Sequence, residues 1–289
     1  MILVITGPTG VGKTKMSIEL AKRLNAEIIN GDSMQVYQGL DIATAKIKDK
    51  EKQGILHHLF DIVPVTYNYT VYDYQKDCRK KIEEIKARGH NIIIVGGTGL
   101  YIKAALYNYN FNHEEEIYDF SNYTNIELLN EIKKDHDTTI HVNNRKRLER
   151  ELTKIYNHTQ SNGLGNEIVY PFTIIGLTTN RNTLYERINK RVDEMVEEGL
   201  IEEARALYER NIDSKAIQTG IGYKELYRYF NHEITLEEAI TLIKKNSRHY
   251  AKRQYTFFHH QFNMNWFEVN YSDFNQTIEE VYNFIQRED

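Results

Sequence analysis

A single motif near the start of the chain constrains the fold more than any other feature. Residues 7 to 14 read Gly-Pro-Thr-Gly-Val-Gly-Lys-Thr, they follow the apolar run Ile2–Ile5, and a helical pattern comes next. Glycines at this spacing let successive backbone N–H groups curve around an anion, and the following helix adds the positive end of its dipole. The motif predicts a phosphate-binding loop between a buried strand and a helix.

Two side chains of this loop have predicted roles of their own. Lys13 is expected to reach the outer phosphates, and Thr14 is expected to place its hydroxyl on Mg²⁺. The residues predicted to hold the phosphates are Gly7, Pro8, Thr9, Gly10, Val11, Gly12, Lys13 and Thr14. The motif does not say which phosphate compound is bound.

Strands and helices are predicted to alternate through the first half of the chain. Strands are expected over residues 2–5, 27–30 and 91–95, and helices over residues 13–24 and 72–88. Such repeats predict an α/β fold, a P-loop NTPase-like parallel sheet flanked by helices. Ligands bind at the carboxyl ends of parallel strands, so the phosphate-binding loop, Asp32 and Thr98 are expected on one rim.

A polar stretch interrupts this alternation. Residues 110–165 are predicted to form a small helical insertion domain, a candidate RNA-binding unit, with helices over Asn125–Asp135 and Lys146–Tyr156. Residues 1–109 and 166–289 are predicted to form the catalytic core. In its second part, a strand over Phe172–Leu177 is followed by an entirely helical C-terminal part that includes Glu237–Phe258.

Composition excludes several classes of protein. The single cysteine, Cys78, rules out an internal disulfide and a multi-cysteine zinc site, and its apolar helical position indicates a core residue. No apolar run approaches the length of a membrane span, and no signal peptide precedes the loop, so a cytoplasmic protein without membrane contact is expected. The net charge of −4 does not indicate nucleic acid binding, but two basic clusters can still present a basic face. They are Arg145, Lys146, Arg147, Arg150 and Lys154, and Lys244, Lys245, Arg248, Lys252 and Arg253.

Three further residues are candidates for chemistry at the predicted rim. Asp32 can serve as a Mg²⁺ ligand, a general base or a cap of its own turn. The strand over residues 92–95 lacks the acidic residue that many P-loop ATPases carry, which leaves Asp32 as the carboxylate beside the phosphates. Thr98 is a candidate partner of Asp32 or of substrate, or else a residue of a local turn. Arg181 either clamps a pyrophosphate or is a solvated residue at a helix start.

Taken together, these segments resemble the tRNA dimethylallyltransferases. The resemblance covers about residues 2 to 258. Besides the phosphate-binding loop, it rests on the segments Asp32–Tyr37, Gly39–Lys46, His57–Ile62, Gly96–Ile102, Arg187–Asp193, Gly220–Glu225 and Ser247–Gln254.

The resemblance implies a specific reaction. A dimethylallyl group passes from dimethylallyl diphosphate to the N6-amine of the adenosine immediately 3′ of the anticodon, in tRNAs that read codons beginning with U, and diphosphate is released. The catalytic residues implied are Asp32 as general base, with Lys13, Thr98 and Arg181, and Mg²⁺ held partly by Thr14. The implied contacts with the tRNA anticodon stem-loop are Asp32, Ser33, Met34, Gln35, Thr98, Lys146, Arg147, Arg150, Tyr223, Lys224, Lys252, Arg253 and Gln254. A monomer is expected.

Three alternatives remain open on the sequence. A P-loop kinase would transfer phosphate from ATP to a small acceptor, an adenylate isopentenyltransferase would modify a free nucleotide, and an RNA-binding NTPase switch would bind ATP or GTP without transfer. The basic insertion and the basic helix near residue 252 favour an RNA substrate. The insertion departs from the family pattern, because Glu149 and Glu151 dilute its basic face.

Overall fold

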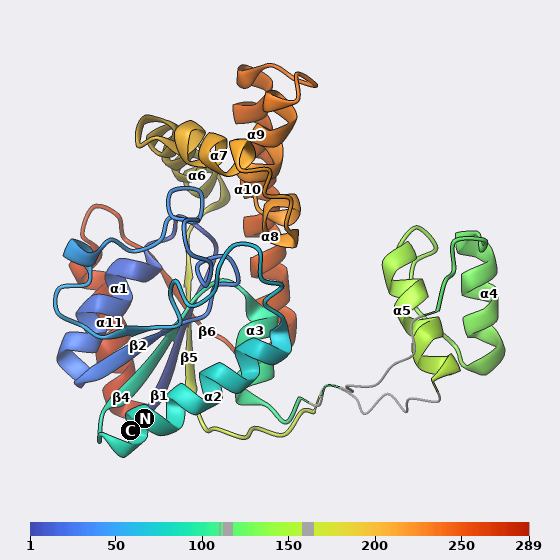
Figure 1. Cartoon of the computed structure of the whole chain (residues 1–289). Coiled ribbons are helices and arrows are strands. Elements are labelled where there is room, and N and C mark those ends of the chain that lie inside the picture. The colour runs from blue at the N-terminus through green and yellow to red at the C-terminus, as the bar shows by residue number, and fades with distance from the viewer. Residues whose placement is uncertain (110, 112–117, 158–164, 289) are drawn as a thin grey trace. The chain divides into compact units, whose positions relative to one another are not determined.

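A computed structural model describes residues 1–109, 111, 118–157 and 165–288 (Figure 1). The chain divides into two compact units, one made of Met1–Leu106 with Val169–Asp289 and the other of Tyr107–Ile168. The predicted limits of the insertion, residues 110 and 165, lie three residues inside the limits of the smaller unit.

The larger unit is built on a six-stranded sheet of order β3-β2-β4-β1-β5-β6. β1 (Ile2–Thr6) lies between β4 (Asn91–Val95) and β5 (Thr173–Thr178), and both neighbours run parallel to it. β2 (Ala26–Asn30) and the short β3 (His57–His58) extend the sheet beyond β4, also in parallel. The predicted parallel α/β sheet is therefore confirmed.

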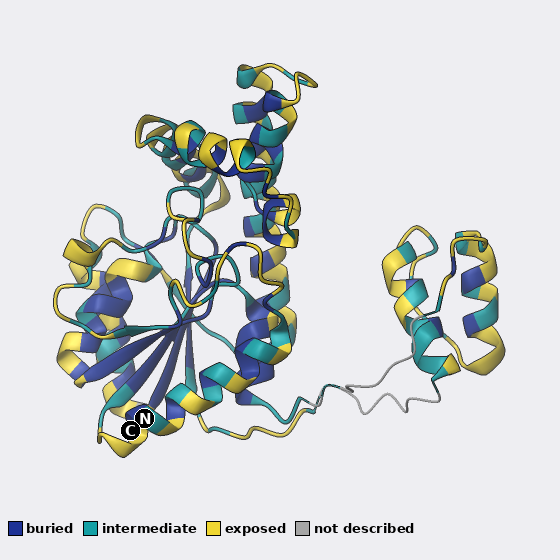
Figure 2. Ribbon diagram, in the orientation of Figure 1, coloured by how far each residue is buried: buried dark blue, intermediate teal, exposed yellow. Residues whose placement is uncertain are grey.

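Helices cover both faces of this sheet, which explains why its central strands β1, β2, β4 and β5 are mostly apolar and buried on both faces. α1 (Lys13–Leu24) and α11 (Phe274–Glu288) lie on one face, and α2 (Val71–Ala87) and α3 (Gly99–Leu106) lie on the other (Figure 1). The strands are the most buried part of the unit (Figure 2). α2 begins at a capping box between Thr70 and Asp73, and Cys78 is fully buried on its inner face, as predicted.

The C-terminal part departs from the prediction at one element. After β5, the helices α6 (Arg181–Glu197), α7 (Leu200–Glu209), α8 (Lys215–Thr219), α9 (Tyr223–Phe230) and α10 (Leu236–Gln261) follow one another. The expectation of helices alone is wrong, because β6 (Asn265–Glu268) pairs in parallel with β5. Four residues are too few for the period of a strand to stand out in the sequence.

The smaller unit has a core of its own. α4 (Asn125–Asp135) and α5 (Arg145–Tyr156) pack against each other, and the predicted helices are confirmed with α5 beginning one residue earlier. The buried residues of this core are Phe120, Leu128, Ile132, Leu148 and Leu152. Elsewhere, one 3₁₀ turn spans Asp49–Glu51. None of the helices in the described part of the chain combines the length and apolar character that a membrane crossing needs.

Candidate active site

A cavity of about 580 Å³ lies where the carboxyl ends of β1, β2 and β4 meet the C-terminal helices. The phosphate-binding loop, the turn Asp32–Gln35 and Val95-Gly96 line it from the sheet, and α6, α10 and residues 219–222 line it from the helical part. All of these residues belong to the larger unit. The structure thus brings together segments that the carboxyl-end rule placed on one rim.

The phosphate-binding loop requires glycine for both conformation and space. Gly12 has φ +106°, a left-handed conformation, and a Cβ there would lie 2.7 Å from the ring of Phe274. Of the loop residues, those that line the cavity are Thr9, Gly10, Gly12, Lys13 and Thr14. Val11 instead buries its side chain in the core beside α1. The loop therefore turns backbone toward the cavity and anchors itself through Val11.

Lys13 is held inside this loop by uncharged acceptors. Its Nζ donates to the carbonyl oxygens of Gly7 at 3.0 Å and Pro8 at 2.9 Å. Burial lowers the pKa of Lys13 to about 8, although the nearby charge of Asp32 opposes this shift. An ammonium group whose hydrogen bonds, among the described residues, go to carbonyl oxygens gains most from an anion in the loop, which is the role predicted for Lys13.

Asp32 is fixed in its own turn at the end of β2. Its Oδ1 accepts from the N–H of Met34 at 2.9 Å, and Asn30 donates to its carbonyl oxygen at 3.0 Å. Burial raises the pKa of Asp32, while the N–H of Met34 and the charge of Lys13 work against that rise. The cap role is thus present in the structure. A cavity carboxylate with a raised pKa is also suited to accept a proton, so the base role stays a prediction.

Thr98 contacts the Asp32 turn through Ser33. The backbone N–H of Ser33 donates to Thr98 Oγ1 at 3.0 Å, and Thr98 Oγ1 donates to Ser33 Oγ at 3.2 Å. The structure therefore gives Thr98 a part in joining the loop after β4 to the Asp32 turn.

Gln254 braces the phosphate-binding loop from α10. Its Oε1 accepts from the N–H of Thr9 at 3.0 Å, and its Nε2 donates to the carbonyl oxygen of Gly97 at 3.1 Å. A Cβ at Gly97 would lie 1.9 Å from that nitrogen, so the approach requires glycine. Gln254 is buried, lines the cavity and joins these two loops, and its predicted contact with RNA stays a prediction.

The structure places Arg181 away from the phosphate-binding loop, where the prediction expected it. Arg181 is the exposed first residue of α6, and its guanidinium lies 5.1 Å from the ring centre of Tyr185, outside the cavity lining. Arg187 and Arg191 line the cavity instead. They lie about 9 and 15 Å further along the helix axis, at about 1.5 Å per residue, and their i, i+4 spacing places both on one face.

Arg187 is held toward the phosphate-binding loop, and Arg191 lies near enough to Lys13 and Asp32 for their charges to interact. Arg187 Nε donates to the carbonyl oxygen of Gly10 at 3.2 Å, and its guanidinium lies 3.9 Å from the ring centre of Tyr271. Burial lowers the pKa of Arg191. The segment Arg187–Asp193 carried both residues in the sequence, but only the direction of α6 shows that they face the cavity.

The remaining residues of the larger unit that were predicted to contact RNA are either buried, part of the cavity lining or exposed on a helix. Tyr223 is fully buried and its hydroxyl donates to Glu203 Oε1 at 2.6 Å, so the predicted RNA contact is corrected to a structural role. Five of the others line the cavity: Ser33, Met34, Gln35, Lys224 and Arg253. Lys252 is exposed on α10.

Fewer basic side chains of the insertion are free of an acidic partner on the helix than its sequence suggests. Arg145 pairs with Glu149 at 2.7 Å, and Lys154 pairs with Glu151 at 3.2 Å. Lys146, Arg147 and Arg150 are exposed on α5. The two acidic residues thus neutralise neighbours on the helix and leave a basic patch of these three residues.

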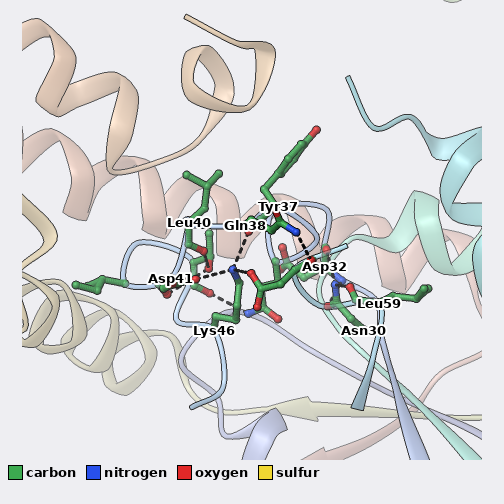
Figure 3. A network of polar contacts seen from close by, with 12 residues as sticks. Asn30, Asp32, Tyr37, Gln38, Leu40, Asp41, Lys46 and Leu59 are labelled. Atoms are coloured by element: carbon green, nitrogen blue, oxygen red, sulfur yellow. Dashed lines mark hydrogen bonds and ion pairs between the residues drawn. The ribbon is translucent and has the colours of Figure 1, made fainter. Parts of the chain in front are cut away.

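A buried cation that sequence reasoning missed fixes the loop after β2. Lys46 Nζ donates to the carbonyl oxygen of Tyr37 at 2.7 Å and pairs with Asp41 at 2.6 Å and with Asp61 (Figure 3). In the same network Asn30 donates to the carbonyl oxygen of Leu59 at 3.0 Å. Because a buried charge needs such partners, Lys46 ties Tyr37 and Asp41, in the segment between β2 and β3, to Asp61, which follows β3.

Comparisons with known proteins agree on one family. The family model described as IPP transferase matches residues 35–261. The tRNA dimethylallyltransferase of Anoxybacillus flavithermus is 46% identical over 300 residues, which cover 99% of this chain and 96% of that protein.

Two solved structures are similar along the whole chain. The full-length tRNA isopentenylpyrophosphate transferase from Bacillus halodurans has a TM-score of 0.78 at 43% identity and covers 99% of this chain and 95% of its own. A eukaryotic dimethylallyltransferase, captured in crystallographic snapshots acting on tRNA, has a TM-score of 0.82 at 27% identity. That match covers 99% of this chain and 79% of the eukaryotic one.

Proposed function

The chain belongs to the IPP transferase family, that of the tRNA dimethylallyltransferases, and we propose that the cavity is its site of prenyl transfer. The substrates are dimethylallyl diphosphate and an adenosine in tRNA. The carbon–oxygen bond to the diphosphate breaks, a bond to the adenine N6 forms, the amine loses a proton, and diphosphate leaves. The observation that carries this proposal is one cavity holding the phosphate-binding loop, two arginines and Asp32.

The donor side of the cavity is suited to stabilise a leaving diphosphate. An adenine amine is a weak nucleophile because its lone pair is delocalised into the ring, so the allylic carbon–oxygen bond must be easy to break. Lys13, Arg187, Arg191 and the N–H groups of the loop surround the place where negative charge develops. Fixed positive groups in a shielded cavity are the largest source of such stabilisation.

On the side of the cavity where the adenine is expected to bind, Asp32 is the group proposed to accept the proton of the amine. Its carboxylate accepts the proton as the new bond forms, and the raised pKa makes it a stronger base than an exposed aspartate. The base must first leave the stack of the anticodon loop, at a cost of about a few kcal/mol that RNA contacts offset. Ser33, Met34 and Gln35 line the same wall and are proposed to contact the extruded nucleotide.

Mg²⁺ fits the donor side as a cation shared with the substrate. The side chain of Thr14 lines the cavity, and no three His, Cys, Asp or Glu residues gather as a metal site among the described residues. A hydroxyl, diphosphate oxygens and water are ligands that Mg²⁺ accepts, so Thr14 would hold it together with the substrate. Bound there, Mg²⁺ would neutralise charge on the diphosphate.

We propose the anticodon stem-loop as the RNA element that is bound, with the adenosine immediately 3′ of the anticodon as target. Exposed Lys146, Arg147 and Arg150 of the insertion, together with Lys252 and Arg253, supply cations for its phosphates. We propose that the protein acts as a monomer, and a tRNA substrate supports action in the cytoplasm.

The test is a transfer assay on short RNAs. The protein is incubated with Mg²⁺, labelled dimethylallyl diphosphate and stem-loops that carry adenosine or guanosine immediately 3′ of the anticodon. Label on the adenosine-bearing RNA alone is the expected result. Label on neither RNA, together with tight ATP binding, would support the kinase alternative instead.

A further inference from the structure

Glu203, on α7, binds a loop that comes from the sheet side of the cavity. Its Oε2 accepts from the N–H groups of Asp41 at 3.0 Å and Ile42 at 2.8 Å, and its Oε1 accepts from that of Ala43 at 3.3 Å. Successive N–H groups that converge on one carboxylate form an anion-binding nest. A residue of the helical part therefore fixes a loop that follows β2.

The same carboxylate holds a second loop of the cavity. The buried hydroxyl of Tyr223 donates to Glu203 Oε1 at 2.6 Å, and Tyr223 directly follows the loop 219–222. A Cβ at Gly222 would lie 2.9 Å from the Cβ of Ala43, so the two loops are in close contact. Glu203 thus sits at the junction of two cavity walls that belong to different parts of the sequence.

The loop that Glu203 holds leads directly to the turn of Asp32. Residues 43–45 line the cavity, and Gln35 Nε2 donates to the carbonyl oxygen of Thr44 at 2.9 Å. On the other side, a Cβ at Gly220 would lie 2.9 Å from Met34 Cε. We define the acceptor wall as residues 32–35 and 43–45. Both loops held by Glu203 contact this wall or form part of it.

We propose that Glu203 is a positioning residue, which fixes the acceptor wall against the loop 219–222 so that the target base meets Asp32. This inference rests on the proposed function. The hydrogen bonds of Glu203 in the described part of the chain go to residues 41–43 and Tyr223, whereas the diphosphate is expected at the phosphate-binding loop and α6. Loss of Glu203 should therefore impair use of RNA and spare binding of the donor.

The experiment compares Glu203→Gln with Tyr223→Phe and with the control Glu202→Gln. The first variant turns an amide donor toward backbone N–H groups, and the second removes one hydroxyl while keeping the carboxylate in its nest. The control removes an equal charge from the exposed neighbour in the first turn of α7, so it matches any effect on the helix dipole. Each protein is assayed for kcat and KM with the adenosine-bearing stem-loop, for dissociation of dimethylallyl diphosphate by calorimetry, and for melting temperature.

We expect Glu203→Gln to lower kcat/KM for the RNA by about tenfold or more, as loss of charge-assisted hydrogen bonds implies. Its donor Kd should stay within about twofold, Tyr223→Phe should be intermediate, and Glu202→Gln should match the wild type. Equal kcat/KM in Glu203→Gln and the wild type, or a parallel loss of donor binding, would overturn the inference. If Glu203→Gln does not fold, a kcat/KM for the RNA in Tyr223→Phe equal to that of the wild type is enough to overturn the inference. If the wild-type protein transfers no label, the proposed function itself is contradicted.

Discussion

Replacing Asp32 by Asn separates its chemistry from its part in the turn. The N–H of Met34 donates to Asp32 Oδ1 at 2.9 Å, and an asparagine keeps an oxygen for that bond. The hydrogen bonds between Asn30 and the backbone of residue 32 do not involve the side chain that changes. Asp32→Asn should therefore keep the fold and the cavity, and lose only the group that accepts the proton.

The magnitude follows from what that group contributes. A positioned general base contributes about 10²-fold to 10⁴-fold to the rate, so kcat should fall by that factor. The fall corresponds to a barrier higher by about 2.7–5.4 kcal/mol. Donor affinity near pH 6.5 should be equal or tighter, because a negative charge has left the cavity. Since the charge of Asp32 also supports the protonated form of Lys13, the pKa of Lys13 should drop below its present value of about 8.

The assay measures kcat for transfer to the adenosine-bearing stem-loop at saturating substrate, with donor binding measured by calorimetry. A kcat within about tenfold of the wild type would refute the base role, since the smallest expected loss is about 10²-fold. A loss of activity that high Mg²⁺ restores would refute it as well, and would make Asp32 a metal ligand. Ser33→Ala, next to it in the same turn, tests whether any change in this turn has the same effect.

The remaining predictions concern the pH dependence of diphosphate binding, RNA binding by the insertion, and the support of Arg187 by Tyr271. Because burial lowers the pKa of Lys13 to about 8, affinity of the free enzyme for the diphosphate should fall as pH rises through that value and Lys13 loses its charge; calorimetry from pH 6.5 to 9.5 checks this, and a flat profile contradicts it. Lys146→Ala with Arg150→Ala should weaken RNA binding and reduce the slope of log Kd against log salt by about 1.4 to 1.8, depending on RNA form; an unchanged slope excludes these phosphate contacts. Tyr271→Leu should weaken diphosphate binding about fivefold or more, as loss of a shielded cation–π contact under Arg187 implies, whereas Tyr271→Phe should not. Equal affinities in the two Tyr271 variants would contradict this support of Arg187.

Local rules account for the parts of the fold and site that the sequence predicted well. The phosphate-binding loop follows from spacing alone, because φ values and close approaches at its glycines are set within a few residues. The buried strands and the capping box of α2 are equally local. Asp32 could be placed near the loop because parallel strands end at one edge, whatever lies between them in the chain.

Local rules could not predict the roles of side chains whose partners lie far away in the sequence. Arg181 lies nearest the end of β5 in sequence, but α6 packs Ile188 against Gly10 and thereby turns Arg187 and Arg191 to the cavity. The sequence does not show that the hydroxyl of Tyr223 donates to Glu203, or that Gln254 accepts from the N–H of Thr9. The burial of such residues is decided by a few contacts across the fold, which no pattern in one segment records.

The layout of the cavity explains how a loop shared with kinases can serve prenyl transfer. Backbone N–H groups bind a diphosphate without regard to what is esterified to it, so the loop alone sets no chemistry. At the end of β4 the cavity is lined by Val95 and Gly96, and Asp32 at the end of β2 faces it instead. The carboxylate therefore stands beside the acceptor wall, which Glu203 contacts at Ala43, and the identity of the acceptor decides the reaction. Selectivity in this protein should thus depend more on the geometry of that wall than on the phosphate-binding loop.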